Sequence, residues 1–179
     1  MNEASLIGLF VATVSFAALL YLAALGELLS EKAGVLNLGV EGMMAIGAVT
    51  AFIAGVELGN PWAALAIAMM SGAALASVHG FFTVALGAEQ VVSGLSLTIL
   101  GLGLAAYLGK DYVGLPPRAE LVPVEWAGLS DIPWVGPIFF SQSPIVYIAI
   151  LMGVAVSVVL TNTRIGLALR ASGESASST

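Results

Sequence analysis

The sequence predicts an all-α fold: a polytopic bundle of about five membrane-spanning helices, followed by a short amphipathic segment. Hydrophobic residues make up 59% of the chain and charged residues only 9%, whereas a soluble domain carries about a quarter charged residues. The apolar residues also come in long blocks, each near the roughly 20 residues that a helix needs to cross a bilayer. The chain has no cysteine, which excludes disulfides and thiolate metal sites. Its net charge of −6 argues against nucleic acid as a partner.

Five apolar blocks are long enough to cross a membrane. The first follows Asn2 and Glu3 with no lysine or arginine before it. It is also longer than the apolar part of a signal peptide, so we expect a retained span. Pro61 and Trp62 mark the turn before the third block, because proline suits the first helical turn and tryptophan suits a membrane interface. The predicted spans are residues 6–25, 33–56, 62–86, 91–108 and 138–160.

Two further stretches are predicted to lie outside the membrane. Residues 110–137 hold five of the seven prolines and charges of both signs, which indicates a long loop. Residues 161–179 are amphipathic with polar flanks, which indicates a surface segment. Five spans place the chain ends on opposite sides, and the positive-inside rule weakly favours an inner C-terminal segment. The inner basic residues are then Lys32, Arg164 and Arg170, and the outer ones are Lys110 and Arg118.

Small residues recur at helical spacing in the third and fourth predicted spans. Lipid tails give helices no hydrophobic reason to associate, so close approach through small side chains supplies the packing. We therefore expect tight helix packing at these positions. Glycines also permit the bent or broken helices that mark transport paths in many carriers. The positions are Gly72, Ala76 and Gly80 on the third span, and Gly94, Thr98, Gly101 and Ala105 on the fourth.

Asn37 and Glu41 are polar groups near the start of the second predicted span. They are four residues apart, so a helix would place them on one face. Glu41 would lie roughly 13 Å beyond Lys32 at about 1.5 Å per residue. An ionisable group at that depth is costly unless it faces protein, water or a partner. Either Glu41 is structural, protonated or bonded to a neighbouring helix, or the pair lines or gates a polar path. Both interpretations predict that Glu41 does not face lipid.

Other polar residues have simpler interpretations. His79 has no second metal-ligand candidate nearby, so we expect a packed residue. Glu89, Gln90 and Ser93 are typical of a solvated turn with a negative charge at a helix N-terminus.

No enzyme motif occurs in the chain. A nucleophile elbow, a zinc-binding His-Glu-x-x-His pair and a phosphate loop are all missing. We therefore expect no enzyme activity and no cofactor. A water or glycerol channel would carry paired Asn-Pro-Ala half-helices, whereas this chain has a single Asn-Pro, before Trp62.

Three stretches together resemble one family. GELLSEKAGVLNLGVEGMMAIGA (26–48) resembles the signature of ABC-importer permeases of the branched-chain amino acid and simple-sugar class, and is closest to the nucleoside-type subgroup. TRIGLALRASGE (163–174) resembles the family's cytoplasmic coupling segment. EQVVSGLSLTILGLGLAAYL (89–108) resembles the intervening span, although the family often has asparagine where this chain has Glu89. The resemblance covers most of residues 20–174.

The resemblance implies a function, partners and an orientation. The chain would be the membrane subunit of an ATP-driven importer of a small polar solute, with nucleosides favoured. Branched-chain amino acids, simple sugars, and a stand-alone channel or secondary carrier are the alternatives. The expected partners are an ABC ATPase subunit that hydrolyses the ATP, a second permease subunit, an extracytoplasmic solute-binding protein and the lipid bilayer. In the plasma membrane, the N-terminus and residues 110–137 would face outward and residues 161–179 would be cytoplasmic.

The resemblance also implies which residues transmit the work of ATP hydrolysis. The segment 161–179 would seat its short helix in a groove of the ATPase. Family members continue with several more spans after this segment, so we expect the chain to be the N-terminal portion of a permease. The expected coupling residues are Arg164, Gly166, Arg170, Gly173 and Glu174.

Overall fold

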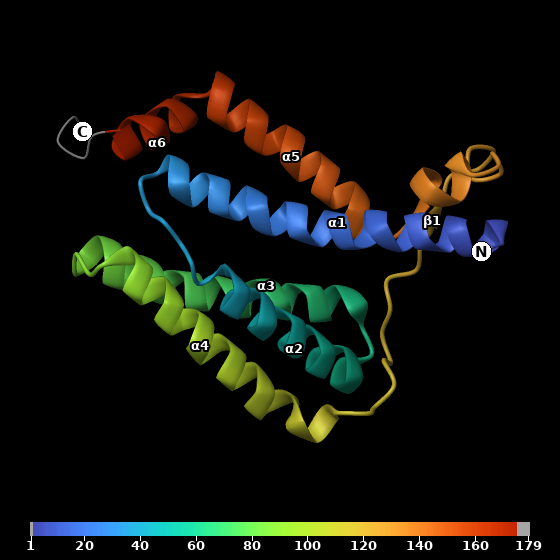
Figure 1. Cartoon of the computed structure of the whole chain (residues 1–179), viewed down its shortest axis with the longest axis horizontal. Coiled ribbons are helices and arrows are strands. Elements are labelled where there is room, and N and C mark those ends of the chain that lie inside the picture. Colours follow the sequence, from blue (N-terminus) through green and yellow to red (C-terminus); the bar gives the residue numbers. More distant parts are fainter. Residues whose placement is uncertain (1, 175–179) are drawn as a thin grey trace. The chain divides into compact units, whose positions relative to one another are not determined.

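A computed structural model of the chain describes residues 2–174. Over these residues it contains five helices that are long and apolar enough to cross a membrane, and the predicted all-α membrane-spanning class is confirmed (Figure 1). A sixth, shorter helix follows them. The spanning helices are α1 (Glu3–Lys32), α2 (Val40–Leu58), α3 (Pro61–Gly80, continued by the π-helical turn Phe81–Ala85), α4 (Gln90–Gly109, followed by the 3-10 turn Lys110–Tyr112) and α5 (Pro144–Asn162).

The second and fifth helices begin later than the sequence predicted. The second span was expected from residue 33, but α2 begins only at Val40. Gly34 adopts a left-handed backbone conformation, with φ of 85°, and this ends α1. The fifth span was expected from residue 138, but α5 begins at Pro144, whose fixed φ suits a first helical position. The residues before it form the π-helical turn Gly136–Phe140 and strand β2 (Ser141–Gln142).

The chain divides into two compact units. The first contains residues up to Leu29 and from Leu121 onward. In it α1 packs on α5 through a small apolar core of Ala18, Val146 and Ala149. Strand β1 (Val124–Glu125) pairs antiparallel with β2, so the second part of the predicted 110–137 loop has regular structure of its own.

A buried glutamine holds β2 to α1 within the first unit. Gln142 is 1% exposed, and its amide oxygen accepts a hydrogen bond from the Ser15 hydroxyl at 2.9 Å. Its amide nitrogen donates to the carbonyl of Ile138 at 2.8 Å. A polar side chain is tolerated at this depth because its hydrogen-bonding groups are satisfied.

The second unit, Ser30–Glu120, consists of α2, α3 and α4 side by side (Figure 1). On α4 the predicted small-residue packing is confirmed: a Cβ added at Gly94 or Gly101 would lie 2.8 or 2.5 Å from a backbone atom of the neighbouring chain segment. On α3 the glycines pack less closely than predicted. A Cβ at Gly72 would just reach Met43 at 4.0 Å, and one at Gly80 would meet nothing within 4 Å.

Candidate functional site

The candidate site is built on the non-helical stretch 33–39, here termed the linking segment, which connects α1 to α2. It runs along the first turns of α4. A Cβ on Gly42, in the first turn of α2, would lie 2.5 Å from the carbonyl oxygen of Leu97. Leu97 is seven residues into α4, roughly 10 Å along that helix at about 1.5 Å per residue. The first turn of α2 therefore lies beside the interior of α4, whereas residues 34–36 of the linking segment lie at the first turn of α4.

Backbone groups of a non-helical segment in a membrane-spanning region need partners, because an unsatisfied peptide group in hydrocarbon costs several kcal/mol. Side chains of α4 supply them. The Gln90 side-chain oxygen accepts from the Leu36 amide at 2.7 Å, and its nitrogen donates to the Gly34 carbonyl at 3.2 Å. The Thr98 hydroxyl donates to the Leu38 carbonyl at 2.8 Å. The linking segment is thus held by polar side chains in place of the hydrogen bonds of a helix.

Glycines bring the linking segment against the α4 backbone. A Cβ on Gly94 would lie 2.8 Å from the Leu38 amide nitrogen, and a Cβ on Gly39 would lie 3.2 Å from the Leu97 Cβ. Larger side chains would separate the two backbones and pull the Thr98 hydroxyl away from its acceptor.

Asn37 lies before α2, so the prediction that it shares a helical face with Glu41 is wrong. The physical reason is the break at Gly34, which prevents the helix from running through residues 33–39. The Asn37 side-chain oxygen instead accepts from the Gly39 amide at 3.0 Å, and its nitrogen donates to the Met43 sulfur at 3.6 Å. This is a turn-stabilising role typical of asparagine.

Glu41 lies in the first turn of α2 and is exposed on this chain. The partial positive charge of a helix N-terminus favours a carboxylate there. The depth estimated from the sequence assumed a continuous helix from Lys32 to Glu41, which the break at Gly34 interrupts, so the depth of Glu41 in the membrane stays a prediction. Glu41 thus presents an exposed carboxyl group at the N-terminus of α2, one residue from the contact of Gly42 with α4.

His79 is a packed residue, as the sequence predicted. Its side chain is 3% exposed and lies near the end of α3. Its Nδ1 is 3.1 Å from the Ser93 hydroxyl and its Nε2 is 3.2 Å from the carbonyl of Leu36 in the linking segment. His79 thus joins α3, α4 and the linking segment.

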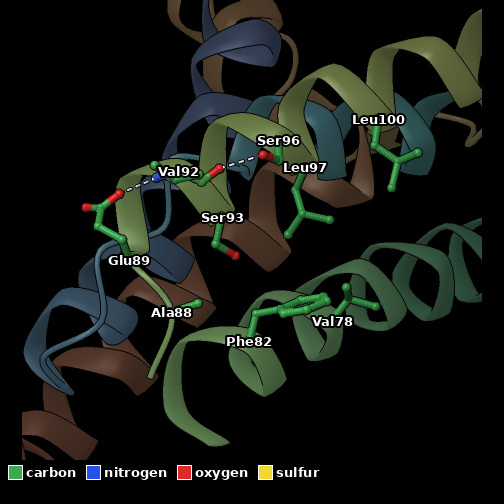
Figure 2. Close-up of a pocket in the computed structure, with 9 residues that line it drawn as sticks. All are labelled: Val78, Phe82, Ala88, Glu89, Val92, Ser93, Ser96, Leu97 and Leu100. Carbon is green, nitrogen blue, oxygen red and sulfur yellow. Dashed lines mark hydrogen bonds between the residues drawn. The ribbon is translucent and has the colours of Figure 1, made fainter. Parts of the chain in front are cut away.

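A groove of about 390 Å³ lies between the end of α3 and the start of α4 (Figure 2). Figure 2 shows Ser93 pointing from α4 toward α3, with Phe82 and Val78 opposite. At the start of α4, Glu89 caps the helix: its carboxylate accepts from the Val91 and Val92 amides at 3.1 and 2.7 Å. Glu89 thus has the helix-terminal role that the sequence predicted. The groove is lined by Val78, Phe82, Ala88, Glu89, Val92, Ser93, Ser96, Leu97 and Leu100.

The predicted coupling residues lie on one short helix, α6 (Arg164–Glu174), directly after α5. A Cβ on the buried Gly166 would lie 2.1 Å from the Val159 carbonyl oxygen, so the elbow between α5 and α6 is closely packed. The Thr163 hydroxyl accepts from the Gly166 amide at 3.1 Å. Ile165 is 73% exposed, so α6 carries an exposed apolar side chain that a partner protein could cover.

The remaining coupling candidates are distributed along α6. Arg164, Gly173 and Glu174 are exposed, whereas Arg170 is half-buried and donates from Nε to the Gly166 carbonyl at 3.4 Å. Their role stays a prediction. Residues 175–179 of the predicted segment lie outside the described residues.

Sequence reasoning missed the polar side chains that hold the linking segment. His79, Gln90 and Thr98 are 41 to 62 residues away from residues 36–38 in the chain. Two glycines within the linking segment, Gly34 and Gly39, could have indicated a break in the helix. Within residues 2–174, no three His, Cys, Asp or Glu side chains are grouped so that they could hold a metal ion.

Comparison with known proteins identifies a family. Residues 9–178 match the family described as "Branched-chain amino acid transport system / permease component". The chain is 42% identical over 172 residues to a putative glucose ABC transporter permease protein of Haloferax volcanii, covering 93% of this chain and 52% of that protein. It is 36% identical over 178 residues to a guanosine ABC transporter permease protein of Bacillus subtilis, covering 91% and 54%.

A nucleoside ABC transporter permease protein of Lactococcus lactis is 30% identical over 188 residues, covering 97% of this chain and 58% of that protein. The chain thus spans about half the length of the curated relatives it matches. No solved structure matches the chain.

Proposed function

Because the chain belongs to the family of branched-chain amino acid transport system permease components, we propose that it is a membrane-spanning part of an ATP-driven importer of a small polar solute. The observation that carries this proposal is the family match over residues 9–178, on a chain with five helices able to cross a membrane. ATP hydrolysis belongs in this proposal to a separate ATPase subunit, as the absence of a phosphate-loop motif predicts.

Nucleosides are the first candidate substrates and glucose is the second. Two of the matched permeases are named for guanosine or nucleosides, and the one with 42% identity is named for glucose. These solutes share a ring that carries several hydroxyl groups, so a path that suits one class offers hydrogen-bonding groups useful to the other. Branched-chain amino acids, which lack such a ring, come third.

Glu41 is the proposed path-lining group. It supplies a carboxylate at a depth where a charged side chain requires water, a substrate or a partner chain, and it is exposed on this chain. Asn37 acts on the same path through the turn that it holds before α2. Solute hydroxyl groups are suitable donors to a carboxylate acceptor.

The proposed orientation places α6 in the cytoplasm and the N-terminus outside. A cytoplasmic α6 docks on the ATPase through its exposed apolar and basic side chains. Arg164, Gly173 and Glu174 are exposed for such a contact, Gly166 packs α6 closely on α5, and Arg170 bonds within α6 to the Gly166 carbonyl. A second permease subunit and an extracytoplasmic solute-binding protein complete the transporter in the plasma membrane.

Substrate choice is tested by uptake in cells that carry or lack the gene for this permease, together with its transporter partners. Radiolabelled guanosine, glucose and leucine are supplied singly, and each is then competed with an excess of the other two. We expect gene-dependent uptake of guanosine that an excess of glucose or leucine leaves unchanged. Gene-dependent uptake of glucose alone would assign the sugar class, and uptake of none of the three would contradict the proposal.

A further inference from the structure

The hydrogen bonds of His79 define its proton position. The Leu36 carbonyl can only accept a hydrogen bond, so the Nε2 of His79, 3.2 Å away, must carry the proton. In a neutral imidazole Nδ1 is then an acceptor, and the Ser93 hydroxyl, 3.1 Å away, is the matching donor. A single neutral tautomer therefore satisfies both ring nitrogens of a side chain that is 3% exposed.

The two bonds of His79 act in different directions. Nδ1 joins α3 to α4 at Ser93, whereas Nε2 joins α3 to the linking segment at Leu36. Gln90 and Thr98 also hold the linking segment, but both reach it from α4. Of the described side chains that hydrogen-bond to the linking segment, His79 is the one that reaches it from α3.

The linking segment leads directly to Glu41. From Leu36 the chain passes through the Asn37 turn and Gly39 into the first turn of α2. Because Gly39 and Gly42 both back onto Leu97, the segment has little room to absorb a displacement of Leu36. A shift of Leu36 would therefore press on the first turn of α2.

We propose that His79 is a positioning residue that latches the linking segment to the end of α3 and thereby sets the position of Glu41 during transport. The role of this latch in transport rests on the proposed function. Its structural part, that the Nε2 bond of His79 immobilises the linking segment, stands independently. The Nε2 bond to Leu36 carries this effect, and the Nδ1 bond to Ser93 orients the ring.

Substitutions can separate the two bonds. Glutamine at position 79 places an amide N–H near the position of Nε2 and can donate to the Leu36 carbonyl. Asparagine is shorter, and places its amide near the position of Nδ1. We therefore expect His79→Gln to preserve the latch, and His79→Asn and His79→Ala to release it.

Mobility of the linking segment is the direct measurement. The sequence has no native cysteine, so Leu38→Cys introduces a thiol that is unique within it for a nitroxide spin label, which is attached before this chain is assembled with its partners. Leu38 is 41% exposed, and Thr98 binds its backbone carbonyl, so the substitution leaves that bond in place. Spectra are recorded on the assembled transporter in lipid vesicles, with His79→Ala, His79→Asn or His79→Gln in the Leu38→Cys background.

The latch predicts a more mobile label with alanine or asparagine and an unchanged label with glutamine. Ser77→Ala is the matched control, because within residues 2–174 the exposed Ser77 hydroxyl donates to the Ala73 carbonyl of its own helix. An unchanged label in His79→Ala, or rescue by asparagine and not by glutamine, overturns the latch. If the His79 variants fail to assemble, Ser93→Ala decides: a label more mobile than in the control supports the latch, and an unchanged label contradicts it.

Transport by the same variants tests the second part of the proposal. Loss of one buried hydrogen bond changes an equilibrium or rate constant by roughly five- to ten-fold. His79→Ala should therefore lower the maximal uptake rate by about that factor. The half-saturating concentration of solute, which the solute-binding protein sets, should stay unchanged. If uptake is normal while the label is mobile, the role of His79 in transport is refuted, and its structural role as a latch stands. Absence of uptake by the unsubstituted transporter refutes the proposed function and leaves the label result intact.

Discussion

A Cβ placed on Gly101 would lie 2.5 Å from the carbonyl oxygen of Gly42, so α4 and α2 touch backbone to backbone. Gly42 in turn backs onto Leu97 and Thr98 of α4. Glycine is needed at both positions because no real Cβ contact is this short. This contact places the first turn of α2, with Glu41, beside the middle of α4.

Gly101→Ala should therefore destabilise the chain. Overpacking of a close contact costs about 1–3 kcal/mol, which should appear as a lower thermal unfolding midpoint of the detergent-solubilised protein. Gly103→Ala is the matched control on the same helix, because a Cβ there meets nothing within 4 Å. Equal midpoints for the two variants would contradict the backbone contact.

The spans could be predicted from the sequence because length and hydropathy decide them. The broken start of α2 could not, because Ala33, Val35, Leu36 and Leu38 satisfy the apolar pattern of a continuous span. The break depends on a left-handed Gly34 and on partners from α3 and α4, distant in the chain.

The sequence predicted only part of the candidate site, because the break before α2 depends on contacts distant in the chain. Glu41 stood out in the sequence because a carboxylate is rare in an apolar block, whereas its depth in the membrane stays a prediction. The helical face shared with Asn37 was wrong because residue spacing has this meaning only inside a continuous helix. Gln142 was missed because its partner Ser15 lies 127 residues away in the chain and is brought to it by tertiary structure.

The close packing at Gly166 predicts a rigid elbow between α5 and α6. Gly166→Ala should move α6 off α5, because the new Cβ would lie 2.1 Å from the Val159 carbonyl oxygen. Uptake driven by ATP should fall by about ten-fold or more, equivalent to about 1.4 kcal/mol, while the protein still inserts into membranes. Ala168→Ser, at an exposed position of α6, is the control. Uptake equal to that of the control would refute an elbow that transmits force.

The proposed orientation can be tested with single cysteines, because the chain has none of its own. Val113, after the end of α4, is 83% exposed, and Ile165 on α6 is 73% exposed. In intact cells a membrane-impermeant maleimide should label Val113→Cys. Ile165→Cys should be labelled only after the cells are permeabilised. The reverse pattern would show that the topology is inverted.

Glu41 should influence transport through its charge and hydrogen bonding. Glu41→Ala should reduce the uptake rate by about ten-fold, which corresponds to about 1.4 kcal/mol. Glu41→Gln, which keeps the size and one acceptor, should have a smaller effect. Glu31→Gln provides the control, since Glu31 is an exposed carboxylate at the end of α1. Unchanged uptake with both variants of Glu41 would return this residue to a structural role.

Concentrative uptake into proteoliposomes tests the central claim most directly. The transporter complex that contains this chain is reconstituted with its solute-binding protein outside and ATP inside, and labelled guanosine or glucose is supplied. Accumulation of one of these solutes above its external concentration, abolished when a non-hydrolysable ATP analogue replaces ATP, is the predicted result. Equilibration to the external concentration at the same rate with or without ATP would identify a channel or passive carrier and contradict an ATP-driven importer.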